Sequence, residues 1–147
     1  MIVIDTSVFI DGIFRYDDQR YEIAKEIFRL TQSLNIILPE IFKVELISQL
    51  VRRIEKKEAL KIYNEIIEKI EIIPIEKLRE LAFSVACDTG SRAIDSYFIA
   101  TAKLTNSILI TNDKIMDNNA KKAGIEAYYL IEEFKKVTKK IEELKQF

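Results

Sequence analysis

Two aspartates stand just after short apolar runs that have the composition of strands. Asp5 follows the β-branched run 2–4 directly, and Asp113 lies shortly after the apolar run 107–110. In open α/β sheets, ligands bind outside the carboxyl ends of the strands, where the strand order reverses. If the first and fourth strands are neighbours in the sheet, these two carboxylates face one crevice.

Two further carboxylates interrupt apolar helical segments. Asp95 shares a helical stripe with Phe98 and Ile99, and Glu45 lies within the apolar run 41–47. A carboxylate on an apolar face is costly to bury unless it is paired, hydrogen-bonded or bound to a cation. Each residue also has an ordinary explanation, because Asp95 could make a local hydrogen bond or salt bridge and Glu45 could be a boundary surface residue.

The missing residue types narrow the chemistry that these acids can perform. The sequence has no histidine and one cysteine, which excludes Ser-His-Asp and Cys-His catalysis and histidine- or cysteine-based zinc sites. Oxygen ligands alone favour Mg²⁺ or Mn²⁺. Such a cation relieves the repulsion among clustered carboxylates and suits phosphodiester hydrolysis. Asp11 and Asp117 each lie about a turn after a strand-end aspartate, and Asp117 could extend the pocket.

The composition is that of a single globular domain, residues 1–147. Hydrophobic residues make up 48% of the sequence and charged residues 32%, with 3 glycines, 2 prolines and no internal repeat. The net charge of −1 argues against a polycationic nucleic-acid binder but leaves room for a local basic rim around an acidic site. Candidates for this rim, each also explained by ordinary solvated helix surface, are Arg15, Arg20, Arg52, Arg53, Lys56, Lys57, Arg92 and Lys114.

The lone cysteine and the hydropathy pattern give two further expectations. Cys87 ends the apolar segment 81–87, so we expect a buried structural thiol. No apolar stretch approaches the length that spans a bilayer, and the apolar N-terminus has no basic leader. We therefore expect a cytoplasmic protein without a membrane segment.

The elements that must position the carboxylates alternate along the chain. Apolar runs predict strands at 2–4, 36–38, 72–73, 107–110 and 126–129. Helical periodicity and capping predict helices at about 6–14, 21–34, 39–54, 58–70, 78–87 and 92–104, a short one ending near 124, and a last one from about 131. This alternation predicts an α/β, three-layer, doubly wound sandwich with a central parallel sheet of about five strands.

The last predicted helix has an apolar stripe of its own. The stripe consists of Phe134, Val137, Ile141 and Leu144. Packing against the core of the same domain is the first expectation for such a stripe, and a dimer or partner surface is the alternative.

The acidic positions and their flanking motifs resemble those of the PIN-domain ribonucleases. The segments that carry the resemblance are 1–7 (MIVIDTS), 39–45 beginning with Pro-Glu, 93–102 (AIDSYFIATA) and 109–113 (LITND). They extend over nearly the whole chain in the family's order and spacing. The subgroup that they resemble most is the VapC-type toxins of toxin–antitoxin pairs.

This resemblance implies a five-stranded, PIN-like parallel sheet and an Mg²⁺- or Mn²⁺-dependent endoribonuclease that acts on single-stranded or structured RNA. It also implies a VapB-like antitoxin partner and a homodimer. The family's acidic quartet matches Asp5 and Asp95 as direct metal ligands, with Glu45 and Asp113 acting directly or through water. Neighbours that could support these acids, or cap the following helices, are Thr6, Ser7, Thr111, Asn112 and Asp117.

Two other functions remain as alternatives. One is a non-catalytic or housekeeping PIN-like RNA-processing module, although such a domain has no reason to keep all four acids. The other is a phosphatase or phosphoacceptor with Asp5 as the nucleophile, but no second acid stands two residues after Asp5.

Overall fold

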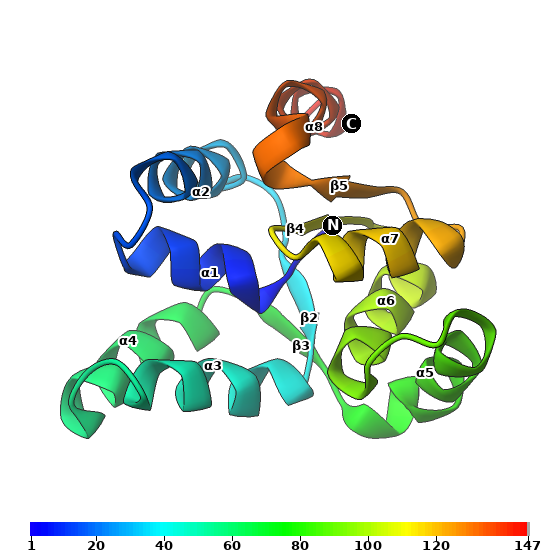
Figure 1. Ribbon diagram of the computed structural model, residues 1–147, viewed down its shortest axis with the longest axis horizontal. Coiled ribbons are helices and arrows are strands. Elements are labelled where there is room, and N and C mark those ends of the chain that lie inside the picture. The colour runs from blue at the N-terminus through cyan, green and yellow to red at the C-terminus, as the bar shows by residue number, and fades with distance from the viewer. Residues whose placement is uncertain (147) are drawn as a thin grey trace.

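Strands and helices alternate in the computed structural model, which describes residues 1–146. Figure 1 shows β2 and β3 lying between the α3–α4 pair and the α5–α6 pair. Five strands stand in the predicted order, with bounds close to those predicted. The elements are β1 (Ile2–Ile4), α1 (Thr6–Ile13), α2 (Asp18–Leu30), β2 (Ile37–Pro39), α3 (Ile41–Val51), α4 (Lys56–Ile67), β3 (Glu71–Ile73), α5 (Ile75–Thr89), α6 (Ala93–Thr105), β4 (Ile108–Thr111), α7 (Lys114–Lys122), β5 (Ala127–Tyr129) and α8 (Leu130–Leu144).

All strand pairs are parallel, as predicted, but the strands form two small sheets instead of one. The first sheet has the order β1-β4-β5, and the second pairs β2 with β3. One isolated bridge between Ile2 and Ile36 links the sheets, beside a 2.9 Å hydrogen bond from Ile2 N to the Asn35 carbonyl oxygen. Because β2 begins one residue beyond this bridge, β1 and β2 share only their first rung and then separate.

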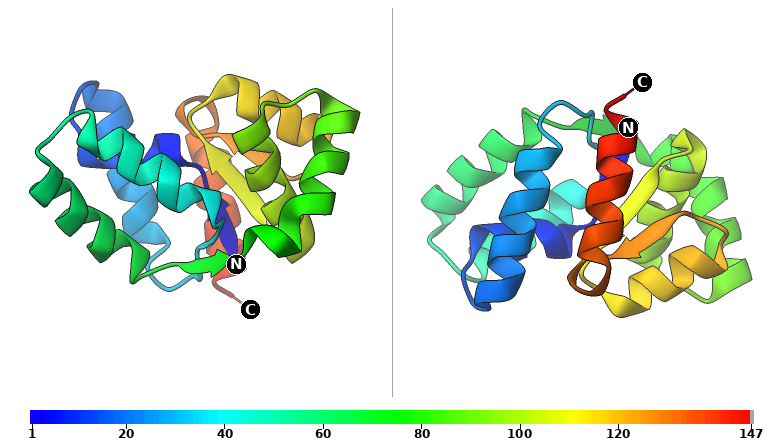
Figure 2. Two further views of the ribbon diagram at one scale, coloured as in Figure 1. Left: turned by 90° about the horizontal axis from the view of Figure 1, so that it is seen from below. Right: turned by 90° about the horizontal axis from the view of Figure 1, so that it is seen from above.

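Helices cover both faces of the strands, which confirms the three-layer α/β architecture. Helix α6 packs against β1, β2 and β4, whereas α8 packs against β4 and β5 and lies beside α2. In Figure 2, α8 is nearest the viewer from above and lies behind the strands from below. The β1 residues Ile2, Val3 and Ile4 are fully buried between these layers, as expected for strands covered on both sides.

The apolar stripe of α8 packs on the domain's own core, which was the first expectation for it. Val137 and Ile141 are fully buried, and Phe134 and Leu144 are partly buried against the same core. Because the domain itself uses this face, α8 does not present its apolar stripe to a second molecule.

The prediction of a buried Cys87 is wrong, since the thiol is exposed. One helix face cannot bury every apolar residue of the segment 81–87, and Phe83, one turn before Cys87, is also exposed. The face of α5 that meets the core consists of Leu78, Ala82, Val85 and Thr89. Within residues 1–146, no helix has the length and apolar character needed to cross a membrane.

Candidate active site

The two strand-end aspartates lie at one edge of the first sheet. Strands β1 and β4 are parallel neighbours with Ile4 opposite Ile110, which confirms the adjacency expected from the sequence. Asp5 directly follows β1, and its backbone N–H donates a 2.9 Å hydrogen bond to the Ile110 carbonyl oxygen. Asp113 follows β4 by two residues and precedes the first residue of α7.

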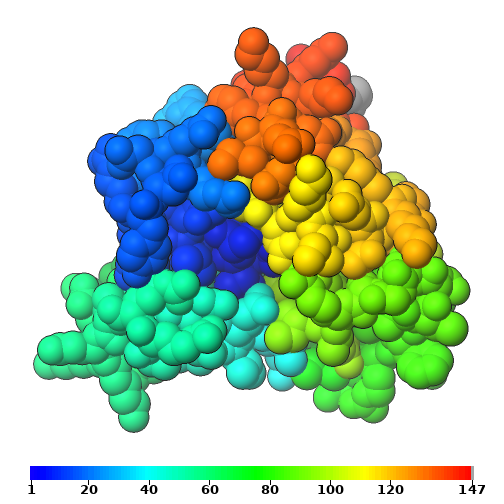
Figure 3. Space-filling view, viewed as in Figure 1, coloured from blue at the N-terminus to red at the C-terminus, as the bar shows by residue number. Residues whose placement is uncertain are grey.

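The two helical acids meet the strand-end pair around one cavity of about 600 Å³. Asp95 enters from the first turn of α6 and Glu45 from the middle of α3. Figure 3 shows the first residues of the chain at the bottom of a hollow between α2, α3 and α7. The lining residues are Asp5, Thr6, Ser7, Ile10, Asp11, Arg20, Glu45, Gln49, Arg53, Arg92, Ala93, Ile94, Asp95 and Asp113.

Asp5 is buried and held by two hydroxyl groups. Its Oδ2 accepts hydrogen bonds from Ser7 Oγ at 2.7 Å and from Thr111 Oγ1 at 2.8 Å. Burial, with a smaller contribution from the charges of Glu45 and Asp95, raises the pKa of Asp5 to about 6 despite these two bonds. The most deeply placed carboxylate is therefore fixed in orientation but costly to ionise.

Thr111 and Asn112 connect the strand-end acids to α1. Thr111 Oγ1 also accepts a 2.9 Å bond from the Asp113 backbone N–H, so one hydroxyl joins both aspartates. The Asn112 backbone N–H donates to Ser7 Oγ at 3.1 Å, and its side-chain Nδ2 donates to Asp11 Oδ2 at 2.7 Å. Three of the predicted supporting residues, Ser7, Thr111 and Asn112, thus belong to the hydrogen-bond network of the acids.

Arg92 is the cation that lies directly among the acids. Its Nε donates to Asp95 Oδ2 at 2.7 Å, and its Nη2 donates to Asp113 Oδ2 at 2.5 Å. Although partial burial opposes the effect, Arg92 and the backbone N–H groups of Ile115 and Met116 hold the pKa of Asp113 below its usual value. The sequence suggested Arg92 only as one of several rim cations, because a contact across 21 residues has no local pattern.

Arg92 does not neutralise the whole cluster. Burial raises the pKa of Asp95 even though Arg92 acts in the opposite direction. Burial also raises the pKa of Glu45, and the charge of Asp95 adds to that shift. Three of the four acids therefore carry raised pKa values, which is the condition that a further cation would relieve.

Asp117 lies apart from the pocket lining. It is buried in α7, and its Oδ2 accepts a 2.9 Å hydrogen bond from Lys121 Nζ. Lys121 also binds Glu133 Oε1 at 2.8 Å, so this acid has a cation of its own. The pocket instead includes Asp11, and it includes Gln49, which the sequence analysis missed although it stands one helical turn after Glu45.

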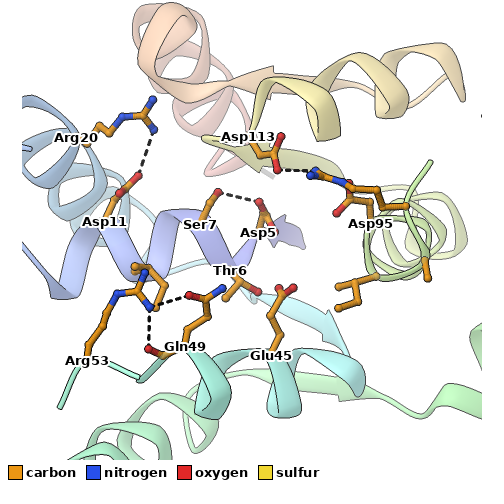
Figure 4. A pocket seen from close by; sticks show the side chains of 14 residues that line it. Asp5, Thr6, Ser7, Asp11, Arg20, Glu45, Gln49, Arg53, Asp95 and Asp113 are labelled. Atoms are coloured by element: carbon orange, nitrogen blue, oxygen red, sulfur yellow. Dashed lines mark hydrogen bonds and ion pairs between the residues drawn. The ribbon is translucent and has the colours of Figure 1, made fainter. Parts of the chain in front are cut away.

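Three of the eight candidate rim cations line the pocket, namely Arg20, Arg53 and Arg92. Figure 4 shows Arg20 and Arg53 at one end and Asp95 and Asp113 at the other. We call these the basic end and the acidic end of the pocket, although Arg20 at the basic end is paired with Asp11 Oδ2 at 3.6 Å.

The acidic end fits a hard divalent cation in its chemistry. Its donors are all oxygen atoms. Thr6 Oγ1 is buried in the lining and makes no hydrogen bond of 3.5 Å or less within residues 1–146, although it lies close enough to Glu45 to oppose the effect of burial, which raises the pKa of that acid. Within residues 1–146, no three acidic, histidine or cysteine side chains are already grouped as metal ligands. The donor set and its raised pKa values thus suit a cation, while Arg92 occupies the space between two of the acids.

Known proteins resemble this chain in fold. A chain of VapBC2 from Rickettsia felis, bound to a DNA fragment from its promoter, superposes with a TM-score of 0.67 at 16% identity, covering 87% of this chain and 98% of that one. A chain of FitAB bound to an IR36 DNA fragment gives 0.65 at 18% identity, covering 87% and 94%. FitAcB from Neisseria gonorrhoeae gives 0.60 at 18% identity, covering 87% and 96%. No curated protein is a detectable match.

Structural similarity at such low sequence identity shows the fold but not the family. A match of the sequence to a family profile does show the family. The profile of the PIN domain matches residues 2–122, which is most of the chain and includes both strand-end aspartates and both helical acids. Strands β1 to β4, helices α1 to α7 and the acidic edge lie within that match, whereas β5 and α8 follow it. The chain therefore belongs to the PIN domain family.

Proposed function

We propose that this chain is a divalent-metal-dependent endoribonuclease that hydrolyses phosphodiester bonds in RNA. The main support for the proposal is that four acids from separate elements line one open cavity. These acids are Asp5, Glu45, Asp95 and Asp113. Burying acids together raises their pKa values and costs free energy, which a structural role would avoid by pairing each acid. A bound cation would offset the repulsion among these acids and would in turn bind an anionic substrate.

The four acids act as metal ligands in the proposed reaction, and neighbouring hydroxyl groups position them. Asp5 and Asp95 would hold Mg²⁺ or Mn²⁺, with Glu45 and Asp113 acting directly or through water. Such a cation lowers the pKa of water and offsets negative charge on a phosphate group. Ser7 and Thr111 fix the rotamer of Asp5 through their hydrogen bonds.

The basic end of the pocket would bind the RNA backbone. Arg20 and Arg53 line the cavity opposite the acidic end, and guanidinium groups bind phosphate in a bidentate manner. The cleaved phosphate would then lie at the acidic end while neighbouring phosphates lie at the basic end. This division also explains how a chain with a net charge of −1 can hold a polyanion.

Cleavage of labelled RNA in Mn²⁺ or Mg²⁺ tests the assignment of the acids. We expect Asp5→Asn and Asp95→Asn each to slow cleavage about a hundredfold or more, because each removes a charged ligand. Asp88→Asn is the matched control, since Asp88 is an exposed acid of α5 away from the pocket. Wild-type rates in either pocket variant, or full activity in EDTA, would show that the assignment is wrong.

We further propose that the nuclease is the toxin of a VapBC-type pair, with a VapB-like antitoxin as its partner. The support is the likeness to chains of VapBC2, FitAB and FitAcB. Expression of the chain in bacteria should arrest growth, whereas the Asp5→Asn variant should not. Normal growth with an enzyme that cleaves RNA in vitro would favour a housekeeping RNA-processing role instead.

Homodimer formation is also part of the proposal. The apolar face of α8 is occupied by the domain's own core, so a dimer would use another surface.

A further inference from the structure

An exposed aromatic ring stands beside the basic end of the pocket. Tyr16, in the loop between α1 and α2, is 72% exposed. Its ring stacks on that of Phe14, with the ring centroids 5.7 Å apart and the planes only 14° from parallel. Phe14 is partly buried against the core, so it holds one face of Tyr16 in place. The loop thereby presents a flat, supported aromatic surface to solvent.

Arg53 links this aromatic surface to the pocket. Its guanidinium carbon lies 5.8 Å from the centroid of the Phe14 ring and 5.9 Å from that of Tyr16. Its Nη1 donates 2.8 Å hydrogen bonds to the carbonyl oxygen and to Oε1 of Gln49, which fixes its position. Arg53 and Gln49 both line the cavity. The aromatic pair and the pocket are therefore joined through one anchored side chain.

Arg53 differs from Arg15 and Arg20 in its charge balance. Arg15 is paired with Asp18 and Glu22, and Arg20 lies 3.6 Å from Asp11 Oδ2. No carboxylate in the part of the chain covered by residues 1–146 forms a salt bridge with Arg53. Its positive charge is thus available to an anion that enters the pocket.

We propose that Tyr16 and Arg53 form a binding site for one nucleotide of single-stranded RNA, with the base stacked on Tyr16 and its phosphate bound by Arg53. This proposal deepens the proposed function and rests on it. Unpaired bases stack on aromatic side chains regardless of sequence, and arginine adds a charge-assisted contact with the backbone. A base-paired nucleotide cannot expose its face in this way, so the site selects single strands.

The position of the site indicates the path that the strand takes across the pocket. Figure 4 places Arg53 at the end of the pocket away from Asp95 and Asp113. A phosphate held among the acids would therefore be followed along the strand by a nucleotide at Tyr16. The pair of residues positions the strand, and neither takes part in the chemistry.

Binding of a fluorescent single-stranded RNA oligonucleotide, measured by anisotropy in EDTA so that no cleavage occurs, tests the site. We expect Tyr16→Ala to weaken binding about tenfold, because stacking contributes on the order of 1–3 kcal/mol per base. Tyr16→Phe should bind within about twofold of the wild type, since the ring is kept. Phe83→Ala is the matched control, because Phe83 is also a highly exposed aromatic side chain, at 76%, and does not line the pocket.

A second readout distinguishes stacking from a general loss of affinity. With 2-aminopurine placed in turn at each position of the oligonucleotide, stacking on Tyr16 should quench the fluorescence at one position. Tyr16→Phe should keep the quenching and Tyr16→Ala should abolish it. Arg53→Gln should lower the slope of log affinity against log salt concentration by about one, as expected for one lost phosphate contact. The same RNA in duplex form should bind more weakly and show no quenching.

The outcomes separate this proposal from the proposed function. Equal binding by wild type and Tyr16→Ala, or equal losses in Tyr16→Ala and Phe83→Ala, would overturn the nucleotide site. If the wild type nevertheless cleaves RNA with Mn²⁺, the nuclease assignment stands. If Tyr16-dependent binding is seen but neither Mn²⁺ nor Mg²⁺ supports cleavage, the nucleotide site stands and the nuclease assignment fails.

Discussion

The molecule holds two clusters of buried and half-buried acids that differ in how the negative charge is balanced. In the Lys121 cluster, consisting of Asp117, Lys121 and Glu133, one ammonium group lies 2.9 Å from the first acid and 2.8 Å from the second. In the acidic pocket, consisting of Asp5, Glu45, Asp95 and Asp113, the guanidinium of Arg92 reaches only two of the four acids.

The pKa values report the same difference. Although partial burial opposes the effect, Lys121 and the Tyr129 backbone N–H lower the pKa of Glu133. In the acidic pocket, burial prevails and raises the pKa of Asp5 to about 6. Both acids of the Lys121 cluster are thus paired with a cation, whereas in the acidic pocket Asp95 and Asp113 are paired with Arg92 and, within residues 1–146, Asp5 and Glu45 form no salt bridge. Acid content alone does not distinguish the two clusters, but charge balance does.

The largest expected effect is a gain of stability when the pocket loses one charge. Folded Asp5 binds a proton up to about pH 6, whereas the unfolded residue releases it near 3.8. Stability therefore falls as the pH rises from about 4 to about 6, and the loss is complete above that range. In EDTA at pH 8, Asp5→Asn should raise the free energy of unfolding by about 3 kcal/mol, with no gain at pH 3, as measured by urea denaturation.

The same substitution in the Lys121 cluster is the matched control. Asp117→Asn removes the charge that pairs with Lys121 and should lower stability at pH 8 by about 1–2 kcal/mol. Changes of the same sign in the two variants would contradict the distinction between the clusters.

A somewhat smaller effect is expected from removing the cation of the Lys121 cluster. Lys121→Met leaves Asp117 buried with no hydrogen bond to either carboxylate oxygen, since its Oδ1 already lacks a partner. We expect the free energy of unfolding to fall by about 2 kcal/mol, less than for a fully buried pair because Lys121 is partly exposed. Lys122→Met, at the exposed neighbouring position, should change stability by less than about 0.5 kcal/mol. Equal losses in both variants would mean that the ion pairs contribute nothing.

The smallest effect is expected on cation binding when Arg92 is removed. Arg92 occupies the space between Asp95 and Asp113 and repels a second cation there. Isothermal titration calorimetry with Mn²⁺ should therefore show binding to Arg92→Gln that is about tenfold tighter, equal to about 1.4 kcal/mol. Arg79→Gln, on the exposed side of α5, should bind Mn²⁺ as the wild type does. Weaker Mn²⁺ binding to Arg92→Gln would show that Arg92 supports the cation site.

The sequence alone was enough to predict the frame of the pocket. The runs before Asp5 and Asp113 had the composition of buried strands, and parallel sheets place the carboxyl ends of neighbouring strands together. The burial of Asp95 followed from its stripe with Phe98 and Ile99, which are also buried. These features depend on apolar runs and helical spacing, which can be recognised within a few neighbouring residues of the sequence.

The charge balance of the pocket could not be predicted in the same way. Whether Arg92 reaches Asp113 depends on rotamers and on how helices pack around the sheets, whereas Asp117 and Lys121 stand four residues apart on one helix, a spacing that allows them to pair. The exposure of Cys87 was missed for a related reason, because the apolar segment around it is wider than the face that α5 buries. Apolar content predicts that a helix is buried but not which of its residues turn outward.

The bond between Thr111 and Asp5 spans 106 residues of the chain. The neighbour of β1, strand β4, is synthesised only after β1 and the segments from α1 to α6 have been made. Until then Asp5 has neither Thr111 nor Asp113 beside it, and long-range strand pairing of this kind forms late in folding. A nascent chain that has not yet reached β4 therefore carries Asp5, Glu45 and Asp95 without the strand pairing that brings Asp113 to them, so the acidic pocket forms only after β4 has been made.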